Sequence, residues 1–327
     1  MANYIVTELS GDTGTISWAV SNAVAGDIIT FDDSLQGENI SIASVLVKQN
    51  VLLRATGEYL SGCFNSIYGT VEINGGAYVL SYADGRHYVT TVKNGGKMQI
   101  QNAKLTRDNS FSWSYIKVEA GGSLNLDGVE SEYANDDKII AIEENANASI
   151  KNSSFNSRIE CKGTLSVEGS TFSGNFIATG ATSINDSAFS YASITGPGSV
   201  LNSKFSILEL GTINATVDEV ETSKLSFSGN ANFANIGKIT ITGTDAIVLN
   251  NAAGDNIRNM LFDGGTVTIT AENAYLTYTG TITGENIISA TYGISAYKFN
   301  YVTVASGATI RATGEYLSGC FNSIYGT

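Results

Sequence analysis

Proline, cysteine and charge are all scarce in this chain. Its 327 residues include one proline, three cysteines and only 15% charged residues, against roughly 25% charged residues in ordinary globular domains. Three cysteines give neither a disulfide framework nor a zinc-binding spacing. No apolar run approaches the roughly 20 residues of a membrane-spanning helix. These absences exclude a small disulfide-stapled protein and predict no transmembrane segment.

Basic residues are too few for a nucleic-acid partner. With 18 Lys and Arg and a net charge of −13, no basic stripe can replace the counterions of a phosphate backbone. The glycines lack the Lys-Ser/Thr that follows a phosphate-binding loop, and no Gly-x-Ser-x-Gly nucleophile elbow occurs. We therefore predict no cofactor, no metal site and no catalytic residue.

The chain does have 35 glycines and 43% hydrophobic residues, enough to form an ordered core. One amphipathic helix is expected, over residues 15–25. Ile16, Ala19, Val20, Ala23 and Val24 form one apolar stripe, with Asp12 or Thr13 as the cap. Such a helix could cover the open end of a stack of strands.

A repeat begins after this helix. A large apolar residue is followed five positions later by another, and an apolar–polar alternation and a glycine-rich turn precede the pair. Glycine permits a tight corner, and the alternation is typical of a strand with one buried face. The pairs are Ile100/Leu105, Leu124/Val129, Ile150/Phe155, Val167/Phe172, Ile184/Phe189 and Val200/Phe205.

Strands and corners that repeat every 16 to 26 residues predict an all-β solenoid, a right-handed parallel β-helix. A β-sandwich is the alternative, but its strands need not keep one apolar spacing, and the hexapeptide pattern of left-handed β-helices is missing. We expect residues 1–45 to form an N-terminal cap and residues 46–327 to form coils that continue beyond residue 327 in a longer protein.

The N-terminal region resembles bacterial pectin-lyase-like β-helix proteins. The likeness rests on Ile5-Val6-Thr7, on residues 14–20 and on Gly26-Asp27-Ile28-Ile29-Thr30-Phe31, a strand, a capping helix and a Gly-Asp-x-Ile-x-Phe strand. The Gly-Gly-x-Leu-x-Leu coils resemble autotransporter passenger and adhesin-like repeats. The resemblance implies a secreted or cell-surface protein, although no signal peptide is visible here. Fold alone assigns no function.

Residues 54–70 recur unchanged as residues 311–327. A recent duplication in a repetitive gene explains this identity. A selected surface motif is the alternative, in which Tyr59, Phe64 and Tyr68 stack on sugar rings and Cys63 and Cys320 crosslink chains.

Three other segments carry residues with chemical potential. Phe111, Trp113 and Tyr115 lie on one side of an expected strand and form a stacking platform for carbohydrate if they face outward; we favour a core position, because a large coil has space to fill. Asp136-Asp137-Lys138, with Glu130 and Glu132 nearby, reads as a solvated acidic loop. Asp84-Gly85-Arg86-His87, which holds the only histidine, reads as an exposed corner.

Three functions follow from this sequence. The first is an adhesin-like surface protein that displays an extended binding face to glycans or to surface molecules of host or neighbouring cells. The second is a polysaccharide-degrading lyase, hydrolase or tailspike. The third is a structural filament that self-associates through the ends of the solenoid.

Overall fold

The computed structural model describes most of the N-terminal two thirds of the chain and chiefly strands beyond it. The described residues are 1–42, 45–81, 89–108, 114–131, 137–211, 215–227, 235–236, 238–241, 247–248, 266–269, 275–278, 281–282, 285–290, 296–304, 306–307, 309–313 and 317–324. They form a right-handed parallel β-helix, and all their strand pairings are parallel. The predicted fold class is confirmed.

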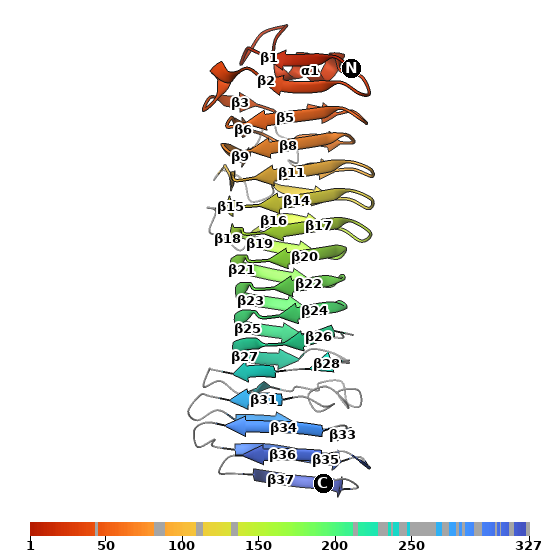
Figure 1. Ribbon diagram of the computed structural model, residues 1–327, viewed down its shortest axis with the longest axis vertical. Coiled ribbons are helices and arrows are strands. Elements are labelled where there is room, and N and C mark those ends of the chain that lie inside the picture. The colour runs from red at the N-terminus through yellow and green to blue at the C-terminus, as the bar shows by residue number, and fades with distance from the viewer. Residues whose placement is uncertain are drawn as a thin grey trace. The chain divides into compact units, whose positions relative to one another are not determined.

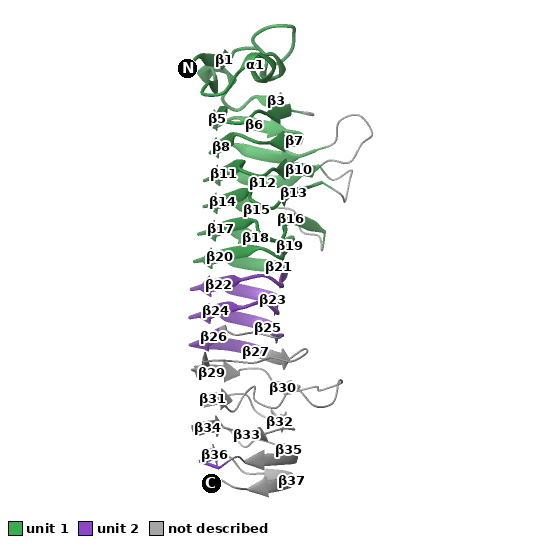
Figure 2. Cartoon of the chain, turned by 90° about the vertical axis from the view of Figure 1, so that its right-hand side faces the viewer, with its two compact units in different colours: residues 1–175 green, residues 176–327 purple. Residues whose placement is uncertain are grey.

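The chain divides into two compact units, residues 1–175 and 176–327 (Figure 2). This division differs from the predicted boundary between cap and coils at residue 45, which stays a prediction. In each unit the strands lie one above the next (Figure 1).

The first unit contains two helical segments and two sets of stacked strands. The helices are α1 (Ile16–Asn22) and the 3-10 helix η1 (Asp33–Leu35). The first sheet contains β1 (Asn3–Val6), β2 (Ile28–Phe31), β5 (Leu52–Thr56), β8 (Thr70–Asn74), β11 (Lys97–Gln101), β14 (Ser123–Asp127), β17 (Asn147–Lys151) and β20 (Thr164–Glu168). The second contains β3 (Asn39–Ser41), β4 (Val45–Val47), β6 (Tyr59–Ser61), β7 (Phe64–Ile67), β9 (Ala77–Leu80), β10 (Val89–Val92), β12 (Lys104–Arg107), β13 (Tyr115–Val118), β15 (Glu130–Ser131), β16 (Lys138–Ile142), β18 (Ser154–Phe155), β19 (Arg158–Cys161) and the start of β21 (Thr171–Ala178).

The second unit repeats this plan. Its first sheet contains β22 (Thr182–Asn185), β24 (Gly198–Leu201), β26 (Ala215–Asp218) and β28 (Asn235–Ile236). Its other strands are β23 (Ala188–Ile194), β25 (Lys204–Leu210), β27 (Val220–Phe227), β29 (Lys238–Ile241), β30 (Ile247–Val248), β31 (Thr266–Ile269), β32 (Tyr275–Tyr278), β33 (Thr281–Ile282), β34 (Glu285–Ala290), β35 (Ala296–Val304), β36 (Thr309–Thr313) and β37 (Leu317–Ile324).

Strand register sets the length of each coil. Thr182 pairs with Gly198, so that coil takes 16 residues, whereas Thr70 pairs with Lys97 and that coil takes 27. Corners between coils use residues with positive φ, among them Asn50 (59°), Gly95 (77°), Gly121 (76°) and Asn145 (59°). Glycine and asparagine tolerate this left-handed conformation best, which explains the turn signals of the sequence.

The predicted apolar pairs are all buried, and most of them stack as expected. Ile100, Leu126, Ile150 and Val167 stand in one interior file of the first unit. Leu105, Ser131, Phe155 and Phe172 stand in the next. One predicted pair is wrong in register: the members of that coil are Leu126 and Ser131, not Leu124 and Val129, because a polar residue occupies the expected apolar position.

Helix α1 is shorter than predicted. Its cap is Thr15, whose Oγ1 accepts the Trp18 N–H at 3.3 Å, and not Asp12 or Thr13. The helix ends at Asn22, and Val24 is 61% exposed. The backbone is already extended at Ala23. Lys48 Nζ donates to the carbonyl oxygens of Ser21 and Ala23 at 2.8 and 2.9 Å and so satisfies two carbonyls that the helix end leaves without a partner.

Candidate functional site

The outer side of the first sheet in unit 1 carries straight files of polar side chains. Strand alternation points Leu53, Val71 and Ile100 inward and their neighbours outward. In-register pairing then aligns Arg54, Glu72 and Gln99 in one file. Thr56, Asn74 and Gln101 form a second file beside it.

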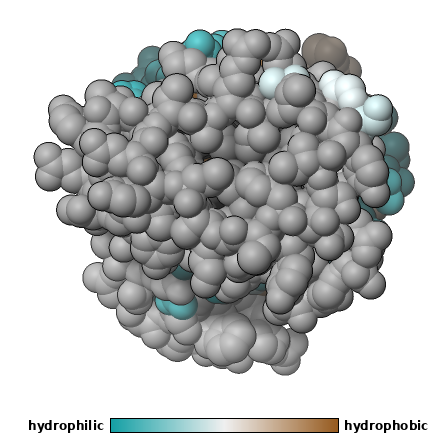
Figure 3. All heavy atoms as spheres, turned by 90° about the horizontal axis from the view of Figure 1, so that it is seen from below, coloured by the Kyte–Doolittle hydropathy of each residue, from teal (hydrophilic) through white to brown (hydrophobic). Residues whose placement is uncertain are grey.

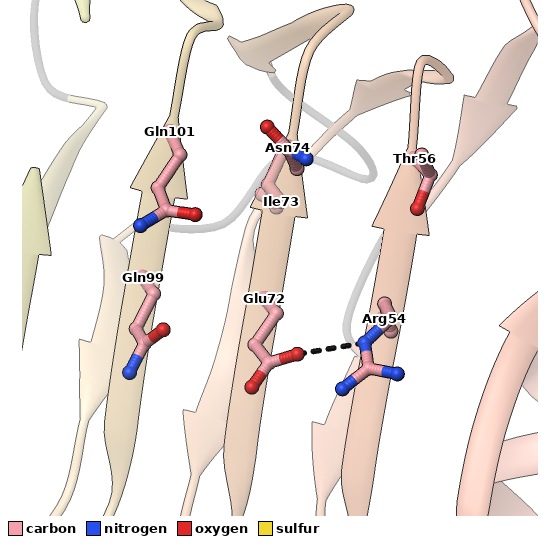
Figure 4. A pocket seen from close by; sticks show the side chains of 7 residues that line it. All are labelled: Arg54, Thr56, Glu72, Ile73, Asn74, Gln99 and Gln101. Carbon is pink, nitrogen blue, oxygen red and sulfur yellow. Dashed lines mark hydrogen bonds and ion pairs between the residues drawn. The ribbon is translucent and has the colours of Figure 1, made fainter. Parts of the chain in front are cut away.

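These two files enclose a shallow groove on β5, β8 and β11, shown in Figure 4. We call it the amide groove: Arg54, Thr56, Glu72, Asn74, Gln99 and Gln101, with Ile73 beneath them. Its volume is about 250 Å³, less than the roughly 300 to 1,000 Å³ of pockets that enclose a drug-sized ligand. A ligand in this groove would therefore remain partly in water.

One ion pair lies in the groove, between Arg54 and Glu72. Arg54 Nε is 2.8 Å from Glu72 Oε2. Both side chains are in contact with solvent, and such pairs contribute only about 0.2 to 1 kcal/mol to stability. The pair has little energetic value for the fold, but it leaves the groove without net charge.

Most of the other polar side-chain groups of the groove make no hydrogen bond within the described part of the protein. The amides of Gln99 and Gln101 and the terminal nitrogens of Arg54 make no hydrogen bond to any residue that the structure describes. Asn74 Oδ1 accepts one bond from Asn102 Nδ2, at 3.4 Å. Because an amide offers both donors and an acceptor, the groove is equipped to bind a ligand rich in hydroxyl groups.

A second polar surface lies on β10, β13, β16 and β19. We call it the charged face: Lys93, Lys117, Glu119, Lys138, Arg158 and Glu160. Each glutamate is held between two cations. Glu119 is 3.0 Å from Lys93 Nζ and 3.4 Å from Lys117 Nζ, and Glu160 is 3.1 Å from both Lys138 Nζ and Arg158 Nε. Partial burial raises the pKa of Glu119, but the two lysines outweigh burial and lower this pKa below its ordinary value. Mutual ion pairing holds these side chains against one another.

Tyr115 lies beside the charged face, and the prediction that it is a core residue is wrong. Ile116 and Val118 take the inward positions of β13, so alternation places Tyr115 outside. One face of its ring is covered, because Lys138 Nζ lies over the ring at 4.6 Å from the centroid. A bulge in β16 between Lys138 and Ile140 re-aims Lys138 toward the ring.

The first copy of the duplicated segment has a mixed exposure. Tyr59 and Tyr68 are 44% and 42% exposed, as a surface motif requires. Phe64 and Cys63 are core residues and not the surface residues that the sequence suggested. Phe64 packs against Tyr78, with ring centroids 6.0 Å apart. The Cys63 thiol donates to the Ser81 carbonyl at 3.8 Å, and burial raises its pKa to about 11, so it is not available to crosslink chains.

Several predicted residues lie outside the described part. Trp113, Asp136, Glu132 and residues 82–88 are among them, as is the side chain of Cys320. Asp137 is described, and it is not simply solvated, because its Oδ2 is 3.1 Å from Nη2 of the buried Arg107. In the described ranges no three His, Cys, Asp or Glu side chains are arranged to hold a metal ion.

Sequence reasoning missed the amide groove. Alternation in Lys97-Met98-Gln99-Ile100-Gln101 does indicate two outward glutamines. The coil lengths, which place Arg54 and Glu72 beside them, follow only from strand register.

Elsewhere on the surface, most of the described residues visible at the rim of the end-on view in Figure 3 are hydrophilic.

No helix in the described residues is long and apolar enough to cross a bilayer. Comparisons with protein families, with curated proteins and with solved structures find no match to this chain. The parallel β-helix is therefore established by strand pairing alone.

Proposed function

We propose that this chain is part of a secreted or cell-surface adhesin-like protein that binds glycans through the amide groove. In this proposal it belongs with the pectin-lyase-like and autotransporter-passenger β-helix proteins that its N-terminal region and coils resemble. The β-helix acts as the display scaffold, and its polar outer side chains make the contacts.

One observation carries the proposal: the amides of Gln99 and Gln101 face a surface groove without a partner among the described residues. Sugar hydroxyls both donate and accept hydrogen bonds, as these amides do. A partly exposed site binds weakly, so useful adhesion would require many copies on one surface, where effective concentration raises avidity.

The experiment measures binding of the whole chain to immobilised neutral oligosaccharides. The double variant Gln99→Ala/Gln101→Ala is compared with Asn125→Ala, which alters an outward amide of the same file outside the groove. Hydrogen bonds contribute about 0.5 to 1.5 kcal/mol each, so we expect the double variant to bind roughly tenfold more weakly and Asn125→Ala to bind like wild type.

Absence of binding by the wild-type chain, or equal binding by the double variant, would overturn the proposal. The polysaccharide-degrading alternative is checked in the same samples, because cleavage of the oligosaccharides would release shorter products. Self-association is checked by the concentration dependence of the sedimentation coefficient.

A further inference from the structure

We infer that the amide groove binds a neutral, unbranched glycan that lies along the stack of coils, one sugar ring to each of β5, β8 and β11. This inference rests on the proposed function and specifies its ligand. The ligand class, direction and length each follow from a separate feature of the groove.

The direction follows from strand register. Arg54, Glu72 and Gln99 are equivalent positions in three successive coils, and so are Thr56, Asn74 and Gln101. Successive coils are about 4.8 Å apart. The groove therefore runs across the strands, and each coil offers one pair of outward side chains to a ligand made of repeating units.

The ligand is neutral because the charges around the groove cancel. Arg54 is paired with Glu72 at 2.8 Å. At the margin, Lys97 stands two residues before Gln99, and Asp127 pairs in register with Gln101, so one cation and one anion flank the groove. An acidic ligand would meet Glu72 and Asp127 and a chain of net charge −13, without an unopposed cation in the groove.

The ligand is a glycan and not a peptide because the groove offers almost no apolar contact. Ile73 is the one apolar lining residue, and it is 1% exposed. A peptide would bring apolar side chains that find no partner here, whereas sugar hydroxyls match the amides, the Thr56 hydroxyl and the guanidinium group.

The length follows from where the lining ends. Beyond β11 the second file continues as Asp127, Lys151 and Glu168. These side chains bind one another and their neighbours: Lys151 Nζ is 2.8 Å from Glu168 Oε2, and Asp127 Oδ1 accepts from Asn152 Nδ2 at 3.0 Å. This charged continuation of the second file offers no unoccupied amide. Asn125, which continues the first file, does not line the groove, whose lining ends at Gln99 and Gln101, so three rings fill the groove.

The test titrates the whole chain with unbranched glucose, galactose and mannose oligomers of one to six rings, and with their uronic-acid counterparts. We expect affinity for the matching neutral series to rise with each ring up to three and to change less than twofold thereafter. The uronic acids of the same length should bind at least tenfold more weakly.

Two variants test the register of rings and coils. Thr56→Ala removes a polar group from the first coil and Gln101→Ala removes one from the third, so each should move the plateau from three rings to two. Asn125→Ala, outside the groove, should leave the plateau at three. Circular dichroism melting confirms that each variant is folded.

The outcomes separate the inference from the proposed function. If no neutral oligomer of any length binds, both fail. If neutral oligomers bind but one ring already gives full affinity, or affinity keeps rising beyond three rings, or the uronic acids bind equally well, the inference fails while glycan binding stands.

Discussion

The Ser170 hydroxyl oxygen accepts a hydrogen bond from the backbone N–H of Ser153, one coil earlier, at 3.1 Å. The same hydroxyl donates to the Glu168 carbonyl at 2.8 Å. Ser153 makes the same pair of bonds, to the Val129 N–H at 3.0 Å and to the Lys151 carbonyl at 2.5 Å. In the second unit Ser203 accepts from the Ser187 N–H at 3.1 Å. Buried serines thus bond successive corners where the ladder of strand bonds is interrupted.

These bonds between buried serines of successive corners, which we call the serine ladder, predict that Ser170→Ala lowers the stability of the protein. This change leaves the buried Ser153 N–H without its acceptor, at a cost of about 1 to 3 kcal/mol. Urea unfolding of the whole chain measures it. The control is Ser183→Ala, whose exposed hydroxyl contacts Ser199 Oγ at 3.0 Å; surface changes usually stay within about 0.5 kcal/mol. Equal effects of the two changes would contradict the structural role of the ladder.

Stacking of the interior phenylalanines predicts a large effect of Phe172→Ala. The rings of Phe155 and Phe172 are 5.7 Å apart and nearly parallel, at 12°, and both are buried. Truncation should cost about 3 to 5 kcal/mol. A double-mutant cycle with Phe155→Leu and Phe172→Leu should give a coupling energy of about 0.5 to 1.5 kcal/mol. A coupling energy near zero would mean that only burial, and not the ring contact, matters.

Asp27 predicts a pH-dependent contribution to stability. The backbone N–H groups of Ala2 and Val24 donate to its carboxylate at 2.6 and 3.0 Å, and these bonds lower its pKa below the ordinary value although burial opposes them. Because the folded pKa is below the unfolded pKa of about 3.9, the contribution is fully present above about pH 4 and is lost as the pH falls through the folded pKa.

We therefore expect Asp27→Asn to lower the melting temperature at pH 7, and the difference from wild type to shrink between pH 4 and pH 2. Asp33→Asn, on an exposed side chain, is the control and should have little effect at either pH. If the difference in melting temperature between wild type and Asp27→Asn stays constant down to pH 2, the shape of the Asp27 side chain, and not its charge, stabilises the protein.

The two buried cysteines of the first unit should react slowly. Burial raises the pKa of Cys63 and of Cys161 to about 11, so at pH 8 only about one thiol in a thousand is the reactive thiolate. In a Cys320→Ser variant, which leaves these two thiols, we expect slow reaction with a disulfide reagent in the native state. Reaction should be rapid in guanidinium chloride. Fast reaction of both thiols in the native protein would contradict their burial.

The sequence was sufficient for the fold because the coil pattern is local. Alternation, a positive-φ corner residue and an apolar pair lie within about ten residues, and each coil repeats them. The interior positions of Phe155, Phe172, Phe189 and Phe205 follow from that pattern alone. The sequence did not predict where α1 ends. There Lys48, some 25 residues away in the chain, binds the last carbonyl oxygens.

Only the tertiary structure determines which outward side chains line one groove. Arg54, Glu72 and Gln99 are separated by 18 and 27 residues, and coils of unequal length hide this alignment from any fixed period. The alternation of inward and outward positions is a property of a single strand, so the sequence shows it, although which positions face inward was wrongly predicted at Phe64 and Tyr115. Neighbours across coils depend on backbone pairing between distant segments, and only the register of those hydrogen bonds brings the amide groove together.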